Sequence, residues 1–65
     1  MTKTFETDYG TVTVCNAMFD IDGTNLEEGI EIKGEGFLIE NYGWRYIDEM
    51  TVEDVEELIE KEHYH

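Results

Sequence analysis

The sequence contains no serine and no proline, a single cysteine, and only four lysine or arginine residues among 65. The absence of serine excludes a serine nucleophile. Because Cys15 is alone, neither an internal disulfide nor a metal site with two thiolates can form. Small secreted domains more often carry several disulfides, so a lone cysteine favours a reducing cytoplasm.

Long apolar runs are also missing. No stretch approaches the roughly 18 apolar residues that a membrane-spanning helix needs. Residues 1–10 are polar and lack the apolar segment of a signal peptide. We therefore expect a cytoplasmic protein with no membrane segment.

The chain has an excess of acid: 17 Asp or Glu residues and a formal net charge of −13. Repulsion among so many like charges lowers the stability of a compact state. Anionic membrane surfaces and free DNA or RNA should repel the chain. We therefore expect no membrane and no direct nucleic-acid partner. A strongly basic protein partner, cation binding and a need for solubility are the remaining explanations of the charge.

The length of 65 residues predicts one compact acidic domain, residues 1–65. A chain this short buries only about 60% of the surface that its unfolded form exposes, so the core should be modest. Hydrophobic residues nevertheless make up 40% of the chain, which argues against disorder.

Glycines divide the first two thirds of the chain into segments of strand length. The residue patterns predict strands at 3–7, 11–21, 29–33, 37–40 and 44–47, with turns between them. After Gly43 there is no glycine, and the composition changes to Glu, Val, Leu and Ile. We predict an α+β fold, in which a small antiparallel sheet of three to five strands carries one C-terminal helix on one face.

The longest predicted strand changes its apolar phase near Cys15. Val12 and Val14 occupy even positions, whereas Ala17, Phe19 and Ile21 occupy odd ones. A bulge at this point would place all of them on one face of the sheet. Alternatively, the strand is covered on both faces. The sequence leaves both possibilities open.

Thr51 is the predicted start of the helix. It is a favourable N-cap residue, and Asp54 follows three positions later, as in a capping box. An apolar stripe at helical spacing comes next, formed by Val52, Val55, Leu58 and Ile59. Most other positions are acidic: Glu53, Asp54, Glu56, Glu57, Glu60 and Glu62.

The segment Met18-Phe19-Asp20-Ile21-Asp22-Gly23-Thr24 resembles the first motif of the haloacid-dehalogenase phosphatase superfamily. The resemblance implies a phosphoryl-accepting nucleophile at Asp20 and a general acid/base at Asp22. That family also needs a parallel doubly wound sheet, a Ser/Thr, a Lys and a further acidic pair on Mg²⁺, a scaffold that 65 residues cannot supply. We therefore interpret Asp22-Gly23 as a turn after a strand. We expect no catalytic residue, no metal and no cofactor.

The predicted helix concentrates the negative charge. Its six acids would lie along about 16 Å of axis, or about one charge per 2.7 Å. Duplex DNA carries about one per 1.7 Å. Asp48 and Glu49 would extend this field before the helix begins. The alternative is a solvated face that keeps the domain soluble, although such faces usually mix Lys with Glu, and only Lys61 does so here.

These features favour a non-enzymatic acidic inhibitor that mimics nucleic-acid charge and blocks a basic nucleic-acid-binding site on another protein. Phages and mobile elements often encode small acidic proteins of this kind as anti-defence proteins, including anti-CRISPR proteins. Such a protein would act in the host cytoplasm. The residues predicted to bind the partner are Asp48, Glu49, Glu53, Asp54, Glu56, Glu57, Glu60, Tyr42, Trp44 and Tyr46.

The alternative function is a small protein-interaction or dimerisation module. Tyr42, Trp44 and Tyr46 alternate along the chain and could therefore line one face of the sheet. A module of this kind would use that aromatic face to dock or to dimerise. The sequence therefore leaves a monomer and a homodimer open.

Overall fold

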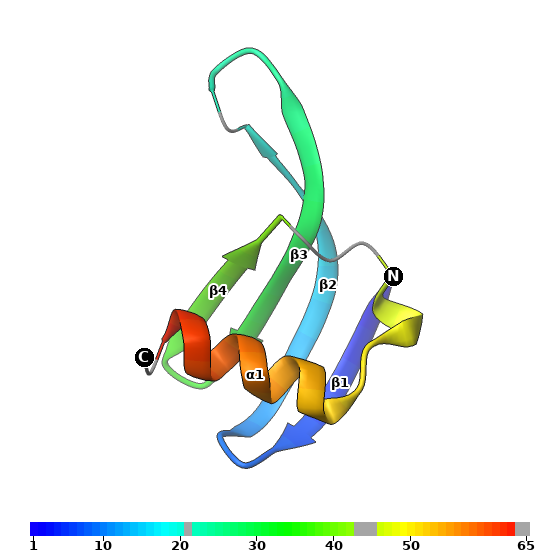
Figure 1. Cartoon of the computed structure of the whole chain (residues 1–65), viewed down its shortest axis with the longest axis vertical. Coiled ribbons are helices and arrows are strands. Elements are labelled where there is room, and N and C mark those ends of the chain that lie inside the picture. Colours follow the sequence, from blue (N-terminus) through cyan, green and yellow to red (C-terminus); the bar gives the residue numbers. More distant parts are fainter. Residues whose placement is uncertain (21, 43–45, 64–65) are drawn as a thin grey trace.

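A computed structural model describes residues 1–20, 22–42 and 46–63 of the chain. Its four-stranded antiparallel sheet has the order β1-β2-β3-β4, and one C-terminal helix crosses one face (Figure 1). The predicted α+β class is confirmed. The elements are β1 (Thr2–Thr7), β2 (Gly10–Asp20), β3 (Leu26–Gly34), β4 (Phe37–Asn41), the 3₁₀ helix η1 (Ile47–Glu49) and α1 (Val52–Glu62).

The β2–β3 hairpin is longer than its neighbours. β1 pairs with β2 only as far as Cys15, and β4 pairs with β3 only as far as Ile30. Beyond those points β2 and β3 pair only with each other, until Asp20 meets Leu26. The hairpin therefore projects from the rest of the sheet as a finger (Figure 1). The domain is correspondingly elongated, measuring 37 × 25 × 16 Å.

The β2 strand contains no bulge. Its pairing with β3 runs in one register from Thr13 opposite Lys33 to Asp20 opposite Leu26. Since side chains alternate between the faces of a strand, Val14 and Phe19 lie on opposite faces. The structure therefore excludes the bulge, and it buries Val12 and Val14 on the helix-side face and Phe19 on the opposite face.

The core lies between the sheet and α1. The helix contributes Val55, Leu58 and Ile59, while Val52 at its first position is 37% exposed. The rest of the buried cluster comes from the helix-side face of the sheet and from η1: Phe5, Val12, Val14, Ile30, Ile32, Ile39, Ile47 and Met50. Among the described residues, twelve apolar side chains are buried, Phe19 on the other face included, which is a modest core.

The start of α1 has the predicted capping box. The Thr51 hydroxyl accepts from the Asp54 amide at 3.2 Å, and the Asp54 carboxylate accepts from the Thr51 amide at 2.9 Å. These two bonds satisfy backbone donors that the first helical turn leaves without partners. Local side-chain chemistry thus fixes where the helix begins.

Two predicted boundaries are wrong. Residues 26–28, assigned to a turn, belong to β3, because the long hairpin continues its pairing there. The predicted strand at 44–47 ends in η1 instead, whereas Trp44 and Arg45 lie outside the described residues. In a 3₁₀ turn, positions i and i+3 lie on the same side. Ile47 and Met50 therefore both reach the core, at 1% and 2% exposure.

Gly29 allows close packing on the outer face of the sheet, the face opposite α1. A Cβ at this position would lie 2.5 Å from the Asn41 carbonyl oxygen and 2.9 Å from the Phe19 ring. The Phe19 ring meets the Tyr42 ring edge-on, with centroids 4.9 Å apart. A side chain at Gly29 would force this packing and the end of β4 apart.

We expect Gly29→Ala to destabilise the fold by about 1–3 kcal/mol, the usual cost of overpacking a filled site. Urea unfolding followed by circular dichroism measures the change. The matched control is Glu27→Ala, at an exposed position two residues earlier on the same face, which should change stability by about 0.5 kcal/mol or less. Equal stabilities of the two variants would contradict this packing.

Candidate protein-binding surface

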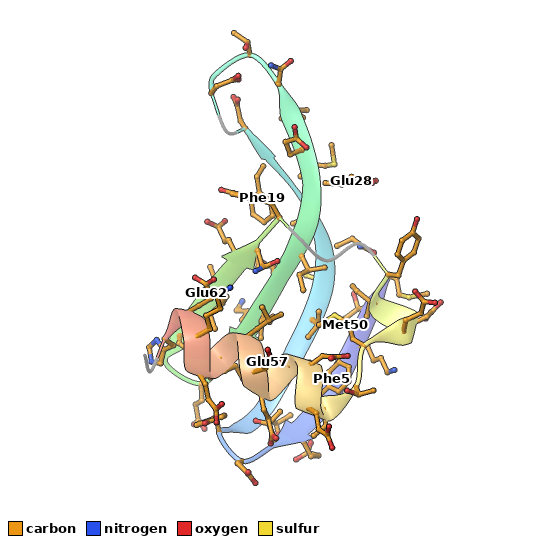
Figure 2. The ribbon with its side chains drawn as sticks, viewed as in Figure 1. Phe5, Phe19, Glu28, Met50, Glu57 and Glu62 are labelled. Carbon is orange, nitrogen blue, oxygen red and sulfur yellow. The ribbon has the colours of Figure 1, made fainter. Side chains whose placement is uncertain are left out.

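No described residue with a polar or charged side chain is buried. Every acidic residue among them is therefore at least partly exposed to solvent. The apolar stripe of α1 faces the sheet, and its acids therefore occupy the flanks and the outer side of the helix. Figure 2 shows Glu57 and Glu62 on α1, which crosses the sheet with its charged side toward solvent. The fold thus displays the charge.

Four of the six acids of α1 fall into two groups. Glu56 and Glu60 face the β1–β2 turn, where the Glu56 carboxylate accepts from the Asp8 amide at 2.7 Å. The Glu60 carboxylate accepts from the Tyr9 hydroxyl at 2.6 Å. These two contacts join residues 48 and 51 positions apart in the chain. They fasten the helix to the edge of the sheet, so both side chains have a structural role.

Glu53 and Glu57 form the second group. They are four positions apart, which places them on one side of the helix, and both are exposed. Asp48 and Glu49 are exposed in η1, just before the helix. Asp54 is partly buried and belongs to the capping box. Of the seven acids predicted to bind a partner, four are therefore exposed and have no structural role described above. We call these four residues the display set: Asp48, Glu49, Glu53 and Glu57.

The described lysines lie in three different parts of the fold. The Lys3 ammonium donates to the Met50 carbonyl at 3.4 Å and lies 5.1 Å from the centre of the Phe5 ring. Lys33 is exposed in β3, on the outer face of the sheet. Lys61 in the last turn of α1 lies four positions after Glu57 and therefore on the same side of the helix as Glu53 and Glu57.

The predicted aromatic face does not form from the described residues. Tyr42 packs on Phe19 at the outer face of the sheet. Tyr46 is 69% exposed and lies on the other side, where it lines a hollow with Asn16 of β2. Trp44 lies outside the described residues. The two described tyrosines therefore lie on different sides of the sheet.

The hollow beside Tyr46 has no signature in the sequence. It is lined by Met1, Asn16, Tyr46, Ile47, Asp48 and Glu49. These residues come from the N-terminus, from the middle of β2 and from η1, and only the folded sheet brings them together. Three of the predicted binding residues line this hollow: Tyr46, Asp48 and Glu49.

The segment that resembles a phosphatase motif leads into a hairpin loop. The Asp22 carboxylate accepts from the amides of Thr24 at 3.0 Å and Asn25 at 2.9 Å, and Asp20 accepts from the Gly23 amide at 2.8 Å. The hydrogen bonds from Thr24 and Asn25 lower the pKa of Asp22 to about 2. Both carboxylates thus organise the loop within an antiparallel sheet. The described part of the chain holds no group of three or more His, Cys, Asp or Glu residues placed to bind a metal ion.

Comparisons with protein-family models, with curated proteins and with solved structures gave no match for this chain. None of the helices in the described ranges has the length and apolar character needed to cross a bilayer.

The contact between Tyr9 and Glu60 predicts a specific pH dependence. The hydrogen bond to Glu60 is the main cause that raises the pKa of Tyr9 from 10.0 to about 12. Because the folded pKa is the higher one, the contact contributes its full stability below about pH 10 and loses it as the pH rises toward 12. We expect NMR titration of the Tyr9 ring to give this raised pKa, and Glu60→Gln to return it toward 10.0.

Glu53→Gln is the matched control, because it removes an equal charge from the same helix at an exposed position. This variant should leave the pKa of Tyr9 near 12. An unchanged Tyr9 pKa in Glu60→Gln would show that the contact does not hold the helix to the turn in solution.

Proposed function

We propose that this chain is a non-enzymatic inhibitor that presents carboxylates in place of phosphates to a basic nucleic-acid-binding site on another protein. The observation that carries the proposal is that no described acidic residue is buried in this small folded body, whose formal net charge is −13. Dividing the 37 Å long axis by 13 net charges gives about one charge per 2.8 Å. This linear density approaches the value of about one per 1.7 Å in duplex DNA.

The rigidity of α1 supports the proposal. Its capping box fixes one end, the buried stripe fixes one face, and Glu56 and Glu60 fix one flank. The backbone positions of Glu53 and Glu57 are therefore set before any partner arrives. A helix that is already formed loses less backbone entropy on binding than a segment that must fold. The net charge also accelerates association with a basic surface.

In this proposal the target is a nucleic-acid-handling protein, such as a host nuclease or a CRISPR effector, and the chain is an anti-defence protein of a phage or mobile element. The chain would act as a competitor of DNA or RNA. A docking or dimerisation module is the alternative function. It has weaker support, because Tyr42 is packed on Phe19 and only Tyr46 of the described pair presents a mostly exposed ring.

We expect affinity capture from a host lysate at low salt to yield a basic nucleic-acid-binding protein. Its complex with the chain should weaken steeply as salt is raised, because screening reduces charge attraction. Added DNA or RNA should displace the chain. A captured partner with no nucleic-acid function, or a complex insensitive to salt, would refute the proposal.

Charge reversal at two displayed positions tests the role of α1. Glu53→Lys with Glu57→Lys should weaken the complex about tenfold or more, because charges at the interface become repulsive. The free energy of unfolding should change by about 1 kcal/mol or less. Calorimetric titration and urea unfolding measure the two effects.

The control pair is Glu31→Lys with Glu40→Lys. These residues are cross-strand neighbours on the outer face of the sheet, away from α1. Both pairs move the formal net charge from −13 to −9, since each exchange adds two positive charges. Equal weakening by the two pairs would show that total charge, and not its position on α1, determines binding.

A further inference from the structure

The projecting part of the β2–β3 hairpin carries apolar side chains that the fold leaves uncovered. On the helix-side face of β2, Val12 and Val14 are buried, but Met18 further along is 55% exposed. On the same face of β3, Ile30 is fully buried and Leu26 is 65% exposed. The row of apolar residues that forms the core thus continues, interrupted by polar positions, onto the uncovered finger (Figure 1).

Acids are interleaved with these two apolar residues. Met18 lies directly opposite Glu28, and Leu26 lies directly opposite Asp20. All four side chains therefore share one face of the sheet. Met18 and Leu26 are diagonal neighbours, a relation that places their backbones about 7–8 Å apart. Figure 2 shows Glu28 on one side of the finger and Phe19 on the other, as this alternation requires.

The hollow beside η1 continues this surface. Asn16, which lines the hollow, precedes Met18 by two positions on the same face of β2. Met1, at 65% exposure, and Tyr46, at 69%, add further uncovered apolar area. We name the whole area the hairpin surface. Its residues are Met1, Asn16, Met18, Asp20, Leu26, Glu28, Tyr46, Asp48 and Glu49.

The apolar part of this composition is typical of an interface, since Met and Tyr are enriched in specific protein–protein contacts. Acids are usually depleted there, so the four acids of this surface call for a basic partner. Solvation alone accounts for the acids but not for Met18, Leu26 and Tyr46, since exposed apolar area lowers solubility. The exposed apolar residues are an observation independent of the acidic charge.

We propose that the hairpin surface binds the basic partner through Met18 and Leu26. An apolar side chain of the partner would pack on these two residues. Lysine or arginine residues around that side chain would face Asp20, Glu28, Asp48 and Glu49. This inference rests on the proposed function and adds the site of specificity: α1 attracts the partner by charge, and the hairpin surface recognises it by shape. A second copy of the chain is a poor occupant, because each copy carries a net charge of −13 and facing acids repel.

Two synthetic peptides of equal length and charge are suitable probes. One contains only lysine and glycine, and the other replaces two central glycines with leucine. NMR titration of ¹⁵N- and methyl-labelled protein at low salt should show both peptides perturbing α1 residues. Only the leucine peptide should perturb the Met18 and Leu26 methyl groups, and it should bind about tenfold more tightly.

The double variant Met18→Ser, Leu26→Ser should abolish that tenfold difference and leave the lysine–glycine peptide unaffected. Leu38→Ser is the matched control, because Leu38 is also 55% exposed but lies on the outer face. It should leave both affinities unchanged. Urea unfolding of all variants shows that they remain folded, as expected for substitutions of exposed side chains.

The outcomes separate the two proposals. If both peptides bind equally and only at α1, the hairpin inference fails while the charge-based function stands. If neither peptide binds at low salt, the proposed function itself fails. Sedimentation experiments test self-association. If the wild-type chain forms a homodimer and the double variant Met18→Ser, Leu26→Ser is a monomer, the surface binds a second copy and the inference is overturned.

Discussion

The apolar layer between α1 and the sheet is the constraint on which the rest of the domain depends. Val55 and Ile59 are fully buried in one cluster with Ile30 and Ile32, and this cluster has few other members. This layer must offset both the conformational entropy of 65 residues and the mutual repulsion of a large acid excess. The helix that supplies a quarter of the buried residues also carries much of the charge. Stability and display are therefore coupled through one element.

The structure resolves part of this conflict by using some acids as hydrogen-bond acceptors. Asp54 caps the helix, Glu56 and Glu60 hold the β1–β2 turn, and Asp22 organises the hairpin loop. A charge-assisted hydrogen bond offsets part of the repulsion that the same carboxylate creates. The number of acids consequently overstates what a partner can contact. Of the acids on α1, Glu53 and Glu57 are the ones that we expect a partner to contact.

The elements that local chemistry determines could be predicted from the sequence. The capping pair Thr51 and Asp54 and the spacing of Val55, Leu58 and Ile59 define α1 without reference to the rest of the chain. The extension of β3 to Leu26 could not be predicted, because it depends on pairing with β2 across a loop. The aromatic alternation from Tyr42 to Tyr46 suggested a strand, but burial of Ile47 and Met50 in the core decides for a 3₁₀ turn at η1.

The binding surface could be predicted only in part, for the same reason. Acid-rich composition identifies α1 directly, whereas the hollow and the hairpin surface join residues from both ends of the chain. The sequence shows Met18 and Leu26 as ordinary strand residues. Their exposure follows from the unequal lengths of the strands, a property of the assembled sheet.

The projecting hairpin divides the domain into a base and a finger with different sequence requirements. Asp20 and residues 22–28 contribute no side chain to the core, whereas Phe19, Gly29 and Ile30 are held by packing. If the hairpin surface binds a partner as proposed, substitutions of its exposed side chains would alter recognition and leave the core packing unchanged. A protein that must follow a changing target would gain from this separation, because recognition could diversify on a constant scaffold.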